Sequence, residues 1–154
     1  PILKKINILQ LINKSLDFIK LSSKNSINLI TKTKSKFING DEDQLNRVFI
    51  NLIKNSEESF LDKMQKEPNF KGNIDIEIND NNEYIIIIIK DNGTGITDSK
   101  KAMTPYFTTK KSGTGLGLPI VTKIINEHSG NFTLKNKKNH NGVSVTISLP
   151  KVYA

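Results

Sequence analysis

Asn51 and Asn55 lie four residues apart in a segment whose apolar residues recur at helical intervals. At that spacing both amides share one helix face beside the apolar stripe, so they would be partly buried. An amide oxygen is a hard, neutral ligand that suits a magnesium ion already carrying phosphate oxygens. Taken alone, the pair is better explained as two surface amides in an asparagine-rich chain.

A carboxylate and two glycines follow the most apolar segment of the chain. Asp91 comes shortly after five consecutive isoleucines, Ile85 to Ile89, and is followed by Gly93 and Gly95. At the end of a buried strand, a carboxylate can accept a hydrogen bond from the amine of a ligand in an apolar slot. The glycines let the backbone approach that ligand closely. Because Asp-Asn-Gly is also a common turn sequence, an ordinary tight turn remains an alternative.

Two further motifs contain groups that could hold phosphates. Gly113-Thr114-Gly115-Leu116-Gly117-Leu118 opens a helix, where uncovered backbone N–H groups and the positive helix end favour anions. It does not follow a strand and lacks a Gly-Lys-Ser/Thr ending, so neither a dinucleotide fingerprint nor a P-loop fits. Upstream, residues 105–110 combine two aromatic side chains with Lys110, which could meet a phosphate or belong to an ordinary loop.

The elements that must position these residues are predicted by periodicity. We expect helices over about residues 7–22, 41–60 and 118–128, and strands over 26–33, 37–38, 74–79, 84–90, 131–135 and 143–149. Strands 74–79 and 84–90 form an expected hairpin, and the isoleucine run predicts a central strand buried on both faces. Residues 63–72, with Pro68, predict a loop. Together they predict an α+β two-layer sandwich, with about three main helices on one face of a mixed, mostly antiparallel sheet.

The composition narrows the possible chemistry. A chain of 154 residues suits one domain, and the absence of cysteine excludes disulfides, thiolate zinc sites and cysteine nucleophiles. No apolar run approaches the roughly 20 residues needed to cross a bilayer. The net charge is +8, but only one of the 23 basic residues is arginine and the lysines are dispersed, which argues against nucleic-acid binding. Because a helical pattern starts almost at Pro1, we expect a domain cut from a larger protein.

The four motifs, in this order, resemble one family. The chain is similar to the ATP-binding catalytic domain of bacterial sensor histidine kinases, within the GHKL (Bergerat) ATPase superfamily. The matching stretches are residues 43–55 (the N box), 91–96 (the G1 box), 105–110 (the F box) and 113–118 (the G2 box), with residues 142–150 similar to the last strand. The sequence Phe107-Thr108-Thr109-Lys110, followed by residues 113–120, most resembles that of the nitrogen-regulation, NtrB/NtrY-like class.

The resemblance implies a role for each matching residue. Asn55 would bind Mg²⁺, and Asn51 would lie beside it on the metal or the phosphates as a second catalytic amide. Asp91 would accept a hydrogen bond from the adenine amino group of ATP. The other implied nucleotide-binding residues are Gly93, Gly95, Ile96, Thr109, Lys110, Gly113, Thr114, Gly115, Leu116, Gly117, Leu118 and Ser144. Residues 97–114 would form a mobile ATP lid, and His128 would be structural rather than a phosphate acceptor.

The resemblance also implies partners. No histidine lies in an acceptor-helix context, so the dimerisation and histidine-acceptor domain is expected upstream of Pro1. ATP would donate its γ-phosphoryl group to that histidine, for relay to an aspartate of a response regulator receiver domain. The fragment alone would be a monomer that cannot phosphorylate itself, whereas the full-length protein would be a homodimer anchored in the inner membrane. This domain would then be cytoplasmic, with no direct membrane insertion and no nucleic-acid partner.

Other functions remain open beside the histidine kinase. A GHKL ATPase of the gyrase, chaperone or mismatch-repair type places a glutamate one turn before the metal-binding asparagine, where it activates water. Here that position is Asn51, whose amide cannot act as a base. The hypothesis of a module that binds nucleic acid or an anionic surface rests on the net charge alone. The sequence alone does not distinguish a histidine kinase as clearly from a protein kinase of the same superfamily that phosphorylates serine. Ser56 and Ser59 depart from the family by replacing small apolar residues, which removes no ligand group.

Overall fold

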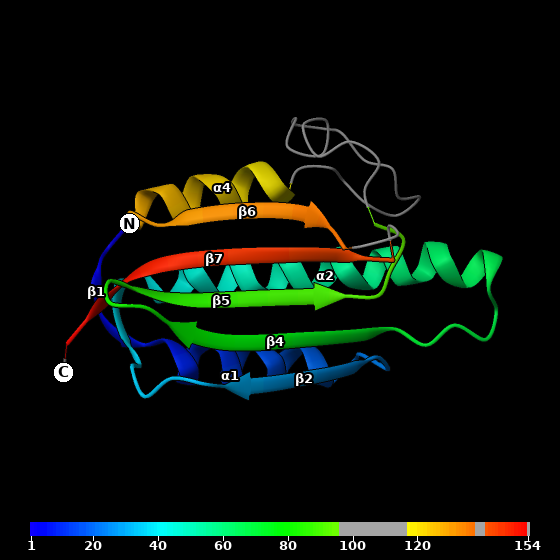
Figure 1. The fold of residues 1–154 in the computed structure, drawn as a ribbon, viewed down its shortest axis with the longest axis horizontal. Helices are drawn as coiled ribbons and strands as arrows, with labels where there is room; N and C mark the ends of the chain where they lie inside the picture. The colour runs from blue at the N-terminus through cyan, green and yellow to red at the C-terminus, as the bar shows by residue number, and fades with distance from the viewer. Residues whose placement is uncertain (96–116, 138–140, 154) are drawn as a thin grey trace.

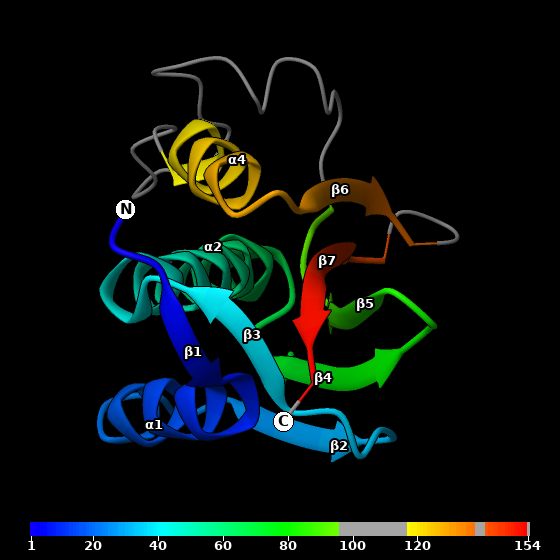
Figure 2. The same ribbon diagram turned by 90° about the vertical axis from the view of Figure 1, so that its left-hand side faces the viewer.

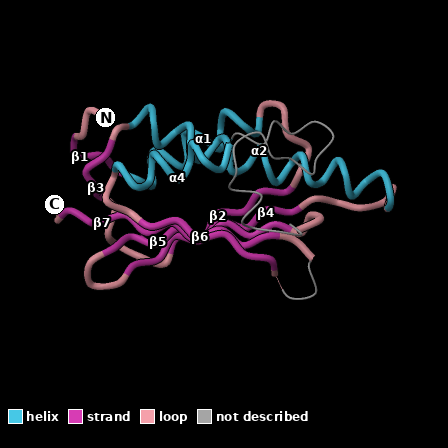
Figure 3. Tube along the Cα trace, turned by 90° about the horizontal axis from the view of Figure 1, so that it is seen from above, coloured by secondary structure: helices cyan, strands magenta, loops and turns pink. Residues whose placement is uncertain are grey.

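Residues 1–95, 117–137 and 141–153 are described by the computed structural model. Within these ranges, three helices pack on one face of a seven-stranded sheet (Figure 3). The helices are α1 (Ile8–Lys20), α2 (Glu42–Lys66) and α4 (Gly117–Glu127). The strands are β1 (Lys4–Asn7), β2 (Ser26–Thr31), β3 (Phe37–Gly40), β4 (Asn73–Asp80), β5 (Tyr84–Asp91), β6 (Asn131–Asn136) and β7 (Val143–Val152). The expected α+β sandwich is confirmed.

The sheet brings the end of β5 beside the start of β7 (Figure 1). Its strand order is β1-β3-β7-β5-β4-β2, and β6 also pairs with β7. Only β2 and β4 run parallel among the described neighbours; the other pairs are antiparallel, including the expected β4–β5 hairpin. Because β5 and β7 are antiparallel, Lys90 lies opposite Ser144, and the two ends that carry Asp91 and Val143 meet.

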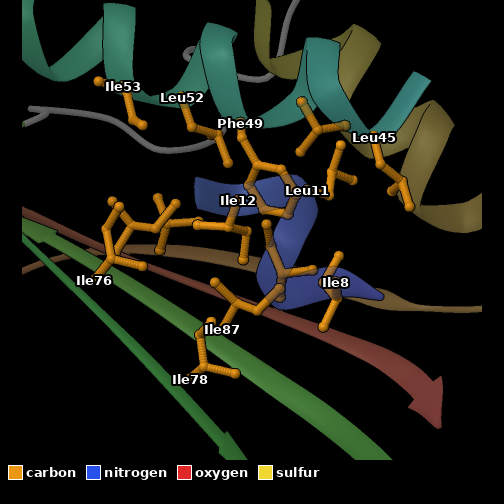
Figure 4. Close-up of a cluster of buried hydrophobic side chains, with 14 of the residues drawn as sticks. Ile8, Leu11, Ile12, Leu45, Phe49, Leu52, Ile53, Ile76, Ile78 and Ile87 are labelled. Carbon is orange, nitrogen blue, oxygen red and sulfur yellow. The ribbon is translucent and has the colours of Figure 1, made fainter. Parts of the chain in front are cut away.

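The core lies between the sheet and the helices. Side chains from α2, such as Phe49 and Leu52, point toward Ile76 and Ile87 of the sheet, and α1 completes the layer (Figure 4). The predicted stripe of α2 is buried, and the helix begins where the Asp41 side chain accepts a hydrogen bond from the backbone N–H of Gln44. Apolar burial on one helix face therefore fixes which face of α2 is turned toward the site.

One strand was not predicted, and the end of one helix was predicted too early. The first expected helix is preceded by β1, a four-residue edge strand in which Lys4 pairs with Gly40. Its residues merge into the helical spacing of α1, so the pattern did not separate them. The expected loop at residues 63–72 begins later than predicted, because α2 continues to Lys66. Pro68 restricts mainly the residue that precedes it, Glu67, and so leaves the last helical turn intact.

The expectation for β5 is half right. The strand is central, and Ile85, Ile87 and Ile89 are buried beneath the helices. Ile86 and Ile88 lie on the other face and are only half-buried, so burial on both faces is wrong. Isoleucine favours strands even where one face is uncovered, and a run of five therefore does not prove a second layer. In the described parts, no helix is both long and apolar enough to span a membrane.

Candidate nucleotide-binding site

Asp91, the last residue of β5, is only 6% exposed, and three donors contact its carboxylate. Its Oδ1 accepts hydrogen bonds from the backbone N–H groups of Gly93 (3.0 Å) and Val143 (3.1 Å). Its Oδ2 accepts one from the Ser56 hydroxyl (2.7 Å). A carboxylate can accept about four hydrogen bonds. The described residues make three, which leaves Asp91 capacity to accept one from a ligand.

Asp91 forms part of the wall of a cleft whose lining is mostly apolar, as is usual for small-molecule sites. The apolar part of the wall comes from Leu52, Leu118, Leu134, Val143 and Val145. Its polar groups come from Asn55, Ser56, Ser59 and Asp91, and Gly95 completes the lining. The polar groups are thus gathered on α2 and at the end of β5. This arrangement suits a largely apolar ligand that carries a hydrogen-bond donor for Asp91.

The turn after Asp91 runs directly against α2. A Cβ at Gly93 would lie 1.8 Å from the Ser59 Oγ, so this position requires glycine unless Ser59 moves. Gly95 has a φ of 76°, in the left-handed region that glycine adopts without strain. Both glycines of the motif are therefore explained by the backbone path around the cleft.

The turn is also anchored from outside the cleft. The Asn92 side chain accepts a hydrogen bond from the Asn73 backbone N–H (2.7 Å) and donates one to the Lys71 carbonyl (3.1 Å). The Lys63 ammonium, in the last turns of α2, donates to the Asn92 carbonyl (3.0 Å). The part of α2 that was expected to be a loop thus helps to hold the backbone next to Asp91.

Asn55 lies where α2 meets the start of α4. A Cβ at Gly117, the first residue of α4, would be 3.6 Å and 3.7 Å from Nδ2 and Oδ1 of Asn55. The first backbone N–H groups of a helix and its positive dipole end favour anions such as phosphates. Asn51 lies one turn earlier on α2 and does not line the cleft. Within the described ranges, no group of three or more histidine, cysteine or acidic side chains could hold a metal. A single amide oxygen fits Mg²⁺ that is carried by ligand phosphates, not a protein-only metal cage.

The structure brings together most of the predicted site residues that it describes. Asn55, Asp91, Gly95 and Leu118 line the cleft, and Gly93 and Gly117 lie beside it. Ser144 is not brought to the cleft. Successive residues of a strand point to opposite faces, so with Val143 and Val145 lining the cleft, Ser144 lines a groove on the other face. The remaining predicted residues, Ile96, Thr109, Lys110, Gly113, Thr114, Gly115 and Leu116, and the expected lid at residues 97–114, lie outside the described residues.

Sequence reasoning missed the contact between Ser56 and Asp91. A signal was present, because Ser56 occupies a position in the apolar stripe of α2 where a buried polar side chain needs a partner. Leu134, Val143 and Val145 were missed for a different reason. They follow the ordinary alternation of strands, and nothing in the sequence distinguishes a cleft wall from core.

His128 joins α4 to α2 at the far end from Asn55. Its Nε2 accepts a hydrogen bond from the Asp41 backbone N–H (2.9 Å), and its Nδ1–H donates to the Ile124 carbonyl (2.7 Å). The ring is 4% exposed. Both nitrogens are used within the fold, as expected for a structural residue.

Known proteins are similar to this chain in both sequence and fold. Residues 40–153 match the family model described as histidine kinase-, DNA gyrase B-, and HSP90-like ATPase. The chain is 39% identical to sporulation kinase A of Bacillus subtilis (strain 168) over 119 residues, which are 76% of this chain and 18% of the relative. It is 38% identical to a putative sensor histidine kinase, NtrY-like, of Rickettsia conorii over 100 residues, 64% of this chain and 16% of the relative. The chain thus spans less than a fifth of the length of these two relatives.

Solved structures agree with this relationship. The catalytic domain of histidine kinase ThkA, in a nucleotide-free form, superposes with a TM-score of 0.81 at 27% identity, covering 97% of this chain and 95% of that one. ThkA in complex with the response regulator TrrA gives a TM-score of 0.75 at 24% identity, covering 97% of this chain and 42% of that one. Since the family model covers most of the chain, including the helices and strands that build the cleft, the chain belongs to the histidine kinase-, DNA gyrase B- and HSP90-like ATPase family.

Proposed function

We propose that this chain is the single ATP-binding catalytic domain of a sensor histidine kinase. One observation carries the proposal: Asp91 keeps capacity to accept a hydrogen bond at the polar end of an otherwise apolar cleft. The adenine ring would occupy the cleft, with its amino group donating to Asp91. The phosphates would extend toward Asn55 and the first N–H groups of α4, where the positive helix end stabilises negative charge.

Asn55 would hold Mg²⁺ together with the ligand phosphates, and Asn51 would support it from the preceding turn. The ion would neutralise phosphate charge when bound. The chain's own residues would orient the nucleotide and exclude water from the base. We leave Ser144 out of the proposed contacts because it faces the other side of β7.

The chemistry at Asn51 favours phosphoryl transfer over hydrolysis. A hydrolytic member of the superfamily needs a base that removes a proton from water, and an amide cannot do this. Glu57 follows Asn55 on α2, but its carboxylate accepts hydrogen bonds from Ser23 and Asn25, away from the cleft. A histidine nitrogen of a separate dimerisation domain would instead attack the γ-phosphorus. The bond to the β-phosphate oxygen would break and ADP would leave.

The partners follow from the same proposal. A dimerisation domain would supply the acceptor histidine, and a receiver domain would take the phosphoryl group onto an aspartate, by analogy with ThkA, which was solved with a response regulator. The whole protein would be a homodimer attached to the inner membrane through other segments, with this domain in the cytoplasm.

Two measurements made in parallel test the proposal. Calorimetry should detect binding of ATP or ADP at submillimolar to millimolar concentration in the presence of Mg²⁺. Phosphate release by the chain alone should stay at background, and labelled phosphohistidine should form when a histidine-bearing dimerisation domain is added. Rapid phosphate release by the unmodified chain would instead support the hydrolytic alternative. Absence of any nucleotide binding would refute both.

A further inference from the structure

Among the described residues, Ser56 is the one whose side chain donates a hydrogen bond to the Asp91 carboxylate. Its hydroxyl lies 2.7 Å from Oδ2, and Ser56 itself is 5% exposed. The two backbone donors, on Gly93 and Val143, both go to Oδ1. Ser56 therefore controls the oxygen that still has capacity to bind a ligand.

The direction of this hydrogen bond is settled by chemistry. An ionised carboxylate has no proton to donate, so the hydroxyl must be the donor. With its proton committed to Asp91, the Ser56 oxygen offers only lone pairs toward the cleft that it lines. Asp91 Oδ2 and Ser56 Oγ together present acceptors and no donor at the polar end of the cleft.

A surface that only accepts hydrogen bonds discriminates between ligands. An amino group can donate to it, whereas a carbonyl oxygen in the same place would meet two other acceptors without a proton between them. Sites that leave buried polar groups unpaired with the wrong ligand reject it strongly. We infer that Ser56 is a specificity-determining residue that makes the Asp91 end of the cleft selective for a base with an amino group over one with a carbonyl. This inference rests on the proposed nucleotide-binding function.

Removal of the Ser56 hydroxyl changes which hydrogen-bonding groups face the ligand, and does not merely weaken one hydrogen bond. In Ser56→Ala, a water molecule can enter from the cleft and take the place of the hydroxyl. Water has two hydrogens, so it can donate to Asp91 and also to a ligand carbonyl. The acceptor-only character is then lost, and the preference for an amino group should shrink even though Asp91 remains.

Ser59 provides a matched control on the same helix. It lines the same cleft and is equally buried, but its hydroxyl donates to the Ser56 backbone carbonyl (2.9 Å) and not to Asp91. Ser59→Ala removes a hydroxyl of the same size and leaves the three hydrogen-bond donors to the Asp91 carboxylate in place. Ser56→Thr keeps the hydroxyl donor and should keep the selectivity.

The test is calorimetric titration of the 154-residue chain with ADP and with inosine diphosphate, which carries a carbonyl in place of the amino group. We expect the unmodified chain to prefer ADP, and Ser56→Ala to reduce that preference roughly tenfold. Ser59→Ala and Ser56→Thr should leave it within about twofold. Thermal melting of each variant checks that it is folded. If the alanine variant does not fold, Ser56→Cys, with a weak S–H donor of similar size, should reduce the preference by a smaller factor.

The outcomes separate this inference from the function on which it rests. An unmodified chain that binds neither nucleotide refutes the proposed function. An unmodified chain that prefers ADP, with a folded Ser56→Ala variant that keeps the preference within about twofold, refutes the role of Ser56 alone. An equal loss of preference in Ser59→Ala would also overturn it, because the effect would then come from packing of α2.

Discussion

The two ends of the α2–α4 pair differ in how they use buried polar groups, although the same two helices form both (Figure 2). At one end His128 meets the Asp41 backbone, and both ring nitrogens are satisfied within the chain. At the other end, where α4 begins beside Asn55, Asp91 is buried but keeps capacity to accept one more hydrogen bond beside an apolar cleft. A buried group with all its partners contributes stability, whereas one with spare capacity selects a ligand.

The largest expected effect is on stability at the His128 end. His128→Ala removes the acceptor of the Asp41 N–H, the donor to the Ile124 carbonyl and a buried ring. We expect the free energy of unfolding to fall by about 3 kcal/mol, from lost hydrogen bonds and a cavity. ADP affinity, measured where the variant is folded, should be unchanged. Urea denaturation measures the loss, with the exposed Lys123→Ala as a control near zero. A large loss of affinity in the folded variant would mean that the two ends are not independent.

The opposite result is expected for Asp91→Asn. The new amide oxygen can still accept from Gly93 and Val143, and its NH₂ can donate to Ser56, so the fold should be largely kept. A donor now faces the ligand amine, and ADP affinity should fall by about 2 kcal/mol, or roughly 30-fold. Calorimetry and urea denaturation of the same preparation compare the two effects. A loss of stability larger than the loss of binding would count against a binding role for Asp91.

A comparable effect, on stability rather than on affinity, should come from crowding of the turn beside Asp91. A Cβ at Gly93 would lie 1.8 Å from Ser59 Oγ and 3.0 Å from its Cβ. Gly93→Ala should therefore cost about 2 kcal/mol of stability through overpacking. Combined with Ser59→Ala, which removes the nearer atom, the loss should be partly recovered. The comparison is a double-mutant cycle by thermal or urea unfolding. Strictly additive effects would show that the turn does not depend on Ser59.

The smallest effect concerns Asp41, at the His128 end. Backbone N–H groups of Ile2 and Gln44 donate to its carboxylate and lower the pKa of Asp41 below its ordinary value. A lowered folded-state pKa contributes stability at neutral pH that is lost as the pH falls through about 4 and below. Asp41→Asn keeps a helix-capping side chain but cannot titrate. Its stability should fall less between pH 5 and pH 3, in urea unfolding, than that of the unmodified chain. Parallel pH profiles for the two proteins would contradict this assignment.

The sequence was sufficient for the parts of the fold that follow from local periodicity. The apolar stripe of α2 and the alternation of apolar and polar residues in β4 each predict which side is buried. Asp91, Gly93 and Gly95 are recognisable because a carboxylate at the end of an apolar strand is followed by two glycines. The errors occurred where local pattern and tertiary environment disagree. β1 exists because β3 lies beside it, and Ile86 and Ile88 are half-buried because the helices that the structure describes all cover the other face of the sheet (Figure 3).

The sequence by itself thus determined the α+β class, the order of the motifs and the residue types that could meet a nucleotide, because these depend on spacing along the chain. Only the tertiary structure decided which of those residues meet. It turned Val143 toward the cleft and Ser144 to the other face of β7, and it made the contacts between Ser56 of α2 and Asp91 of β5 and between Gly117 of α4 and Asn55 of α2. These contacts join segments that are distant in sequence, and the direction of each side chain depends on how the helices pack on the sheet.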